Sequence, residues 1–131
     1  LKTPHTEACY IGYLMERLAL SHPEISFKLI VNNQPKLHTS GNSSLKEIIY
    51  HIYGREIASN LIEIHGENEM ISVNGYIGKP LISRGNRNFE NYFINGRYIR
   101  SSLIARSIEE AYQSFVMQHK YPFTVLQISV K

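Results

Sequence analysis

The dipeptide Asn95-Gly96 is the feature of this sequence that most constrains the fold. It stands between Asn91–Ile94 and Arg97–Arg100, two short runs that contain Tyr, Phe and Ile. Asn and Gly both tolerate the left-handed backbone conformation that a two-residue type I′ turn requires. The sequence therefore predicts a tight antiparallel β-hairpin at this point, and a sheet into which the hairpin fits.

Helix signals surround this hairpin. Thr3-Pro4 is typical of a helix start, and the apolar positions behind it recur at helical spacing until His22-Pro23. Ser44 with Glu47 forms a capping-box pattern that predicts a second helix. Ser101 or Ser102 is expected to cap a third. The apolar positions expected to be buried are Ile11, Leu14, Met15 and Leu18 in the first helix, Leu45, Ile48, Ile49, Ile52 and Tyr53 in the second, and Ile104, Ile108, Ala111, Tyr112 and Phe115 in the third. The aromatic residues Tyr50 and Phe123 are also expected to pack in the core.

The remaining runs read as strands, which gives the order α-β-β-α-β-β-β-β-α-β. Strands are expected at 25–31, 36–40, 61–65, 70–77, 91–94, 97–100 and 122–130. Asn32-Asn33 is expected to form a hairpin turn between the first two strands, and Gly54 is expected to end the second helix. The order predicts an α/β (α+β) fold, one mixed sheet with helices packed on one face. With 131 residues and 43% hydrophobic content, we expect a single domain over 1–131.

Several kinds of site are disfavoured by composition. The chain contains no Asp, the residue that most often holds Mg²⁺ in phosphoryl-transfer sites. Its six His residues fall outside metal-ligand spacings, and Cys9 is expected to be a small core residue. Gly75 and Gly78 do not follow a phosphate-loop pattern. We therefore expect no catalytic step and no cofactor in this chain, and no apolar run is long enough to span a bilayer.

Positive charge is concentrated between Arg84 and Arg106. Five arginines against one acid, Glu90, give this segment a net charge of 5 − 1 = +4. The other nine Lys and Arg against ten Glu give 9 − 10 = −1, for a total of +3. Guanidinium forks and Asn amides suit a phosphate backbone, whose counterions are released on docking. The alternative that the charges alone leave open is a solvated charged face.

The same segment carries a resemblance to a known family. Phe93-Ile94-Asn95-Gly96-Arg97, preceded by Arg84-Gly85-Asn86-Arg87 and followed by the helix of residues 103–112, resembles the MutL family of DNA mismatch-repair proteins. Residues 18–27, which include His22-Pro23, and Ile52-Tyr53-Gly54 match the family as well. The likeness extends over essentially the whole chain.

The resemblance implies that the chain is one part of a larger protein. It corresponds to the family's transducer domain, with the fold of the second domain of ribosomal protein S-five and a left-handed crossover, an exception to the usual handedness. The family's upstream GHKL-type ATPase domain and its downstream ATP-sensing lysine motif are expected outside residues 1–131, and Lys131 is not that lysine. ATP and Mg²⁺ are implied for the parent only.

The resemblance also implies a role, which is to couple ATP-driven dimerisation to DNA in mismatch repair. The residues expected to contact the phosphate backbone are Arg84, Arg87, Arg97 and Arg100, with Asn86 and Asn95 as loop shapers or amide donors. Arg106 either points elsewhere or forms an ion pair on the helix surface. Implied partners are DNA, the parent's own ATPase domain, a mismatch-recognition protein and a second copy of the parent, with no membrane. The expected location is the cytoplasm of a bacterium, at the nucleoid, or the nucleus of a eukaryote.

Two other functions stay open. The basic segment could contact the acidic surface of the ATPase domain or of a repair partner, in which case the chain alone would hardly bind DNA. A third reading is an RNA-binding piece of the translation apparatus that shares the fold, since a fold does not determine a function.

Overall fold

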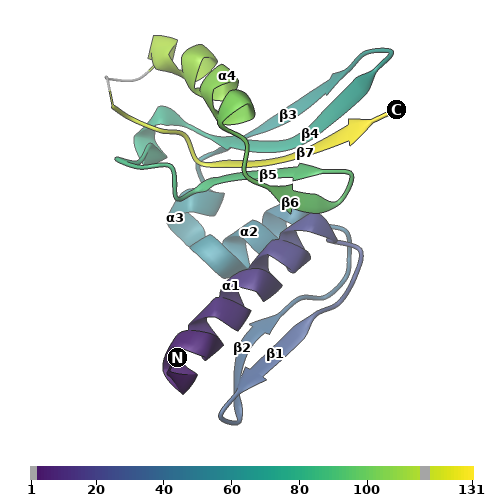
Figure 1. The fold of residues 1–131 in the computed structure, drawn as a ribbon, viewed down its shortest axis with the longest axis vertical. Coiled ribbons are helices and arrows are strands. Elements are labelled where there is room, and N and C mark those ends of the chain that lie inside the picture. Colours follow the sequence, from purple (N-terminus) through teal and green to yellow (C-terminus); the bar gives the residue numbers. More distant parts are fainter. Residues whose placement is uncertain (1–2, 116–118) are drawn as a thin grey trace. The chain divides into compact units, whose positions relative to one another are not determined.

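The computed structural model of the chain describes residues 3–115 and 119–131. It divides into two compact units, residues 1–54 and 55–131, where the sequence predicted a single domain. Figure 1 labels the helices and strands of each unit. No helix within the described residues has the length and apolar character needed to cross a bilayer.

The first unit consists of two helices and a β-hairpin. Helix α1 spans Pro4–Ser21, strands β1 (Lys28–Val31) and β2 (Gln34–His38) pair antiparallel, and α2 spans Leu45–Tyr53. The hairpin turns at Asn32-Asn33, whose φ angles of 51° and 62° lie in the left-handed region. The expected helices and turn are confirmed, but the hairpin forms its own two-stranded sheet and does not join a larger one.

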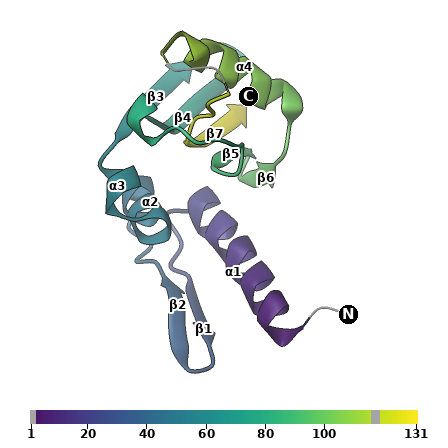
Figure 2. The same cartoon turned by 90° about the vertical axis from the view of Figure 1, so that its left-hand side faces the viewer.

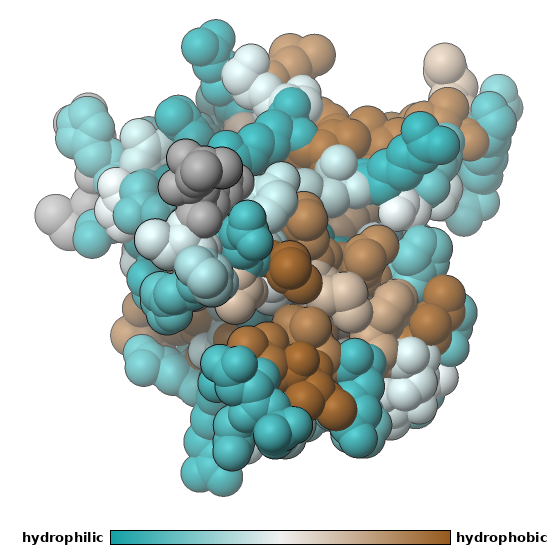
Figure 3. All heavy atoms as spheres, turned by 60° about the horizontal axis from the view of Figure 1, so that its bottom comes forward, coloured by the Kyte–Doolittle hydropathy of each residue, from teal (hydrophilic) through white to brown (hydrophobic). Residues whose placement is uncertain are grey.

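Helix α1 buries a different face from the one its apolar spacing predicted. Ile11, Leu14 and Leu18 expose 48%, 43% and 45% of their surface, so their predicted burial is wrong in this chain. The buried residues of α1 are Arg17 and Ala19–Ser21 in its C-terminal turns. Arg17 Nη1 donates to the Tyr53 hydroxyl at 3.2 Å, which joins α1 to α2. Exposed hydrophobic side chains appear as brown areas among hydrophilic ones in Figure 3.

Two smaller predictions in this unit need correction. Cys9 is exposed, with Sγ 3.8 Å from Nε2 of His5 one turn earlier, and is not a core residue.

The capping box before α2 is only half formed. Ser44 Oγ accepts from Glu47 N at 3.2 Å as predicted, but the Glu47 carboxylate accepts from Asn42 Nδ2 at 2.7 Å, while Ser44 N donates to Asn42 Oδ1. Gly54, with φ 92°, ends α2 as expected.

The second unit is built on a five-stranded mixed sheet. A short helix α3 (Arg55–Ala58) precedes β3 (Leu61–Glu67) and β4 (Ile71–Gly78), and a 3₁₀ turn η1 (Pro80–Ile82) leads to β5 (Glu90–Ile94) and β6 (Arg97–Ile99). Helix α4 (Ser102–Tyr112), the turn η2 (Gln113–Phe115) and β7 (Thr124–Val130) complete it. The strand order is β3-β4-β7-β5-β6, with β5 and β7 parallel and the other pairs antiparallel.

The hairpin predicted from Asn95-Gly96 is confirmed. The two residues have φ angles of 48° and 82°, and Ile94 pairs with Arg97 across the turn. Ser101 is the N-cap of α4, because its Oγ accepts from Ile104 N at 3.2 Å. Figures 1 and 2 show α4 lying across one face of the five-stranded sheet.

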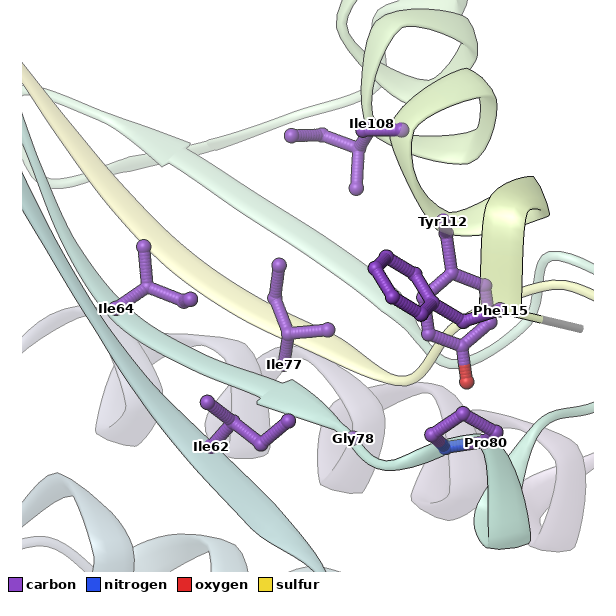
Figure 4. Close-up of a pocket in the computed structure, with 9 residues that line it drawn as sticks. Ile62, Ile64, Ile77, Gly78, Pro80, Ile108, Tyr112 and Phe115 are labelled. Carbon is purple, nitrogen blue, oxygen red and sulfur yellow. The ribbon is translucent and has the colours of Figure 1, made fainter.

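Side-chain alternation decides which strand residues α4 covers. Ile62, Ile77, Leu126 and Tyr92 share the face toward α4, and Phe93, Phe123 and Val125 lie on the opposite face, where each is fully buried. Between α4 and the β3–β4 pair lies an apolar cavity of about 300 Å³. In Figure 4, Ile108 and Tyr112 extend from α4 toward the sheet, and the hydroxyl end of Tyr112 lies near Pro80.

The predicted fold class, a mixed sheet with helices, is confirmed. Of the aromatic residues predicted to lie in the core, Phe123 is confirmed, since it is fully buried. The prediction is wrong for Tyr50 and Phe115, which expose 47% and 74% of their surface. Phe115 lies in η2, past the end of α4, so the helical register that predicted its burial no longer applies. The crossover from β5 to its parallel partner β7 passes through β6 and α4, and its left-handedness stays a prediction.

Candidate nucleic-acid interface

The loop before β5 holds two arginines against aromatic rings. The Arg84 guanidinium carbon lies 4.1 Å from the ring centroid of Phe89, and that of Arg87 lies 4.7 Å from the centroid of Tyr121. Arg84 and Tyr121 also exchange two backbone hydrogen bonds, each 2.8 Å long. The loop is therefore fixed to the segment before β7, and cation–π contacts restrict both guanidinium groups.

The two predicted Asn residues shape loops. Asn86 Oδ1 accepts from the backbone N–H of Asn88 at 2.9 Å, a side-chain turn within the loop. Asn95 Oδ1 accepts from Val130 N at 3.0 Å, and Asn95 N donates to the carbonyl of Ile128 at 2.9 Å. Both contacts tie the β5–β6 turn to β7. Of the two roles that the sequence left open for these residues, the structure records loop shaping.

A polar pocket brings Arg87 and Arg100 together. It lies where the loop, the β5–β6 hairpin and the start of α4 meet, and it has a volume of about 460 Å³. Its lining residues are Arg87, Asn88, Glu90, Tyr92, Tyr98, Ile99, Arg100, Ser101, Ser102 and Ala105. The N-terminus of α4 adds a partial positive charge to the two arginines, so this part of the surface favours an anion.

Arg97 lies at the other end of the hairpin. It pairs with Ile94 across the turn, and its neighbour Tyr98 lines the pocket. Arg97 therefore extends the basic surface from the pocket along the hairpin. The side chains of Arg84, Arg97 and Arg100 are all exposed.

Arg87 is engaged within the chain. Its Nε donates to Glu109 Oε2 at 2.7 Å, and its Nη2 donates to Glu109 Oε1 at 3.0 Å, a bidentate pair. The Glu109 side chain is only 8% exposed, whereas that of Arg87 is 56% exposed. Although burial opposes the shift, the hydrogen bonds from Arg87 lower the pKa of the Glu109 carboxyl. A charged Glu109 thus holds Arg87 at the surface.

A second acid lies beside this pair. Glu90 is buried on β5, and its Oε1 accepts from the Tyr92 hydroxyl at 2.7 Å. Burial raises the pKa of Glu90 to about 8, and the neighbouring Glu109 adds to the rise. Within residues 3–115 and 119–131 no donor reaches Glu90 Oε2. When Glu90 is protonated, this oxygen can carry the proton and donate a hydrogen bond to the carboxylate of Glu109.

Sequence reasoning missed the residues that hold the arginines: Glu109, Phe89 and Tyr121. The usable signal was Glu109 itself, an acid three positions before Tyr112 and so on the same side of α4. The sequence left open whether Arg106 forms an ion pair on the helix surface. No ion pair of Arg106 is found within residues 3–115 and 119–131. Nor do three His, Cys or Glu side chains gather as metal ligands in those residues.

Comparison with known proteins decides the family. A family model described as "DNA mismatch repair protein, C-terminal domain" matches residues 49–131, which is more than half of the chain. The chain belongs to the MutL family of DNA mismatch-repair proteins. The matched range contains the whole of the second unit, including the Asn95-Gly96 hairpin and the arginines of the basic segment 84–106.

Curated relatives support the assignment over nearly the whole of this chain. The chain is 66% identical over 126 residues to the DNA mismatch repair protein MutL of Agathobacter rectalis, covering 96% of the chain and 19% of the relative. It is 41% identical over 130 residues to MutL of Clostridium beijerinckii, covering 99% and 20%. The chain therefore spans about a fifth of the length of these relatives.

Two solved structures share the fold. The chain superimposes with a TM-score of 0.75 and 20% identity on the N-terminal domain of a DNA repair protein, covering 96% of the chain and 43% of that structure. The Aquifex aeolicus MutL ATPase domain complexed with ADP gives a TM-score of 0.66 and 22% identity, covering 100% and 45%. At this identity the likeness establishes the fold of the chain.

Proposed function

We propose that this chain is a DNA-binding transducer region of a MutL mismatch-repair protein and carries no catalytic step itself. The observation that carries the proposal is the exposed basic surface of the second unit, formed by Arg84, Arg87, Arg97 and Arg100. Its contacts would be to phosphates, so binding is nonspecific in sequence. This surface couples the ATP-driven dimerisation of the parent to DNA.

The parent supplies what this chain lacks. We propose that ATP and Mg²⁺ bind in a GHKL-type ATPase domain elsewhere in the parent, because no described residues of this chain form a magnesium ligand set and the sequence has no Asp. The ATPase domain, a second copy of the parent and a mismatch-recognition protein are the proposed partners. A bacterial parent would act in the cytoplasm at the nucleoid.

The proposal predicts salt-dependent binding to DNA. The chain is titrated with duplex and with single-stranded DNA at salt concentrations from about 50 to 200 mM. Its affinity for DNA should fall steeply as the salt concentration rises. Arg97→Ala with Arg100→Ala should weaken binding and lower the log–log salt slope by about one unit per lost contact. Unchanged affinity and slope in this double variant would reject the assigned surface.

One observation favours a second function, that of a protein-interaction module. Arg87 already donates two hydrogen bonds to the carboxylate of Glu109, so the surface is also suited to acidic side chains of a partner such as the parent's ATPase domain. If this function is the right one, the chain alone should bind DNA negligibly even at low salt. The same titration therefore separates the two functions.

A further inference from the structure

The Arg87 side chain is held from two directions by residues far from it in the sequence. Glu109, on α4, engages Nε and Nη2 with bonds of 2.7 and 3.0 Å. Tyr121, just before β7, presents its ring 4.7 Å from the guanidinium carbon. A bidentate pair fixes the plane of a guanidinium group, and a ring on its face restricts rotation out of that position.

Both supports are themselves fixed. Glu109 is almost fully buried in the last turn of α4, so its carboxylate has little freedom to move. Tyr121 is tied to Arg84 by two backbone hydrogen bonds of 2.8 Å. Glu90, the acid that faces Glu109 from β5, is held by the hydroxyl of Tyr92 and stays neutral below about pH 8. The negative charge therefore remains on Glu109, where it orients Arg87.

The outer part of the guanidinium group keeps its donors. A guanidinium has five N–H groups, and Glu109 takes one from Nε and one from Nη2. Nη1 and the second hydrogen of Nη2 form the edge that remains for an external oxygen. The side chain is 56% exposed, and the same pocket contains Arg100 and the start of α4.

We propose that Glu109 and Tyr121 are positioning residues that hold Arg87 as a preformed phosphate ligand for DNA. The proposal rests on the DNA-binding function proposed above. A mobile arginine side chain loses conformational entropy when it binds a phosphate. Arg87 is already held in one conformation in the folded chain, so binding costs less entropy and the affinity is higher. An acid near a DNA surface normally repels phosphates, so a favourable effect of Glu109 is a distinctive expectation.

The test is a double-mutant cycle on the 131-residue chain with a short DNA duplex as the probe. Glu109→Gln should weaken binding about three- to tenfold, although it removes a negative charge. In an Arg87→Ala background the same change should have no such weakening effect. Glu110→Gln is the matched control, since Glu110 is the adjacent exposed acid on α4, and it should leave binding unchanged or slightly tighter.

A second pair of variants guards against misfolding at the buried Glu109. Tyr121→Leu removes the ring and should weaken binding, whereas Tyr121→Phe keeps the ring and should restore it; circular dichroism establishes that each variant is folded. Tighter binding of Glu109→Gln, or equal weakening with and without Arg87, would overturn the positioning role. Failure of the unmodified chain to bind DNA at all would instead reject the proposed function.

Discussion

At the scale of single residues, the environment separates two chemically identical acids. Glu109 keeps its charge because Arg87 donates two hydrogen bonds to it, whereas burial on β5 favours the neutral form of Glu90. Neither property can be read from the sequence, because Glu90 and Glu109 become neighbours only when α4 packs on the sheet. The arginines themselves were predictable from their clustering, but the carboxylate and the rings that hold them were not.

Glu90 should make stability depend on pH. In the unfolded chain a Glu ionises near about pH 4.3, whereas folded Glu90 ionises near about 8. Between these values the folded state keeps a proton that the unfolded state has lost, so the free energy of unfolding falls as pH rises from 5 to 8. Glu109, whose pKa is lowered, contributes stability that is lost only at lower pH, outside this interval. Denaturant titrations at several pH values measure the trend.

The variant Glu90→Gln tests the assignment. It keeps an acceptor for the Tyr92 hydroxyl and removes the titrating group. Its free energy of unfolding should change less between pH 5 and 8 than that of the unmodified chain. Parallel pH curves for the two proteins would show that another group causes the dependence.

At the scale of elements, local signals predicted turns and caps better than they predicted burial. The Asn95-Gly96 turn and the cap of α4 depend on backbone conformation within a few residues. The turn was found where the sequence placed it, and of the two serines that the sequence offered, Ser101 is the cap. The burial of α1 depends on what packs against it. Its buried residues all lie in the C-terminal turns, so Ile11 and Leu14 are exposed. Within those turns Arg17 is buried and Leu18 is exposed.

The pairing of β4 with β7 requires Gly75. A Cβ at this position would lie 2.0 Å from the carbonyl oxygen of Val125, and the φ angle of +148° disfavours other residues. Gly75→Ala should therefore lower the free energy of unfolding by about 3 kcal/mol or more, measured by urea denaturation. Gly66→Ala on β3 is the control, because a Cβ there meets no atom within 4 Å, and its effect should stay below about 1 kcal/mol. Similar losses for both variants would contradict the close contact.

Helix α4 depends on its cap. Ser101 Oγ accepts from Ile104 N, one of the N–H groups that the first helical turn leaves without a backbone partner. Ser101→Ala should cost about 1 kcal/mol in the free energy of unfolding. Ser102→Ala removes the same hydroxyl from the next position, and thermal denaturation should show a loss of less than about 0.5 kcal/mol. Equal losses of stability in the two variants would contradict the assignment of Ser101 as the N-cap.

At the scale of the whole molecule, the sequence predicted the fold class and the family but not the division into two units. Strand and turn signals are local: Asn32-Asn33 predicted that β1 and β2 form a hairpin, but no local signal could show that this hairpin does not join the five strands of the second unit. The charge asymmetry is a property of the whole chain and was visible from the start. It places +4 on residues 84–106 and −1 on the rest.

The central claim is that this basic surface binds DNA through phosphate contacts. The most direct measurement compares the salt dependence of duplex binding for the unmodified chain, for Arg97→Ala with Arg100→Ala, and for Lys28→Ala with Lys46→Ala, which removes the same charge from the first unit. We predict that the arginine variant loses affinity and about two units of salt slope, while the lysine variant keeps both nearly unchanged. Equal behaviour of the two variants, or no binding by the unmodified chain at low salt, would contradict the claim.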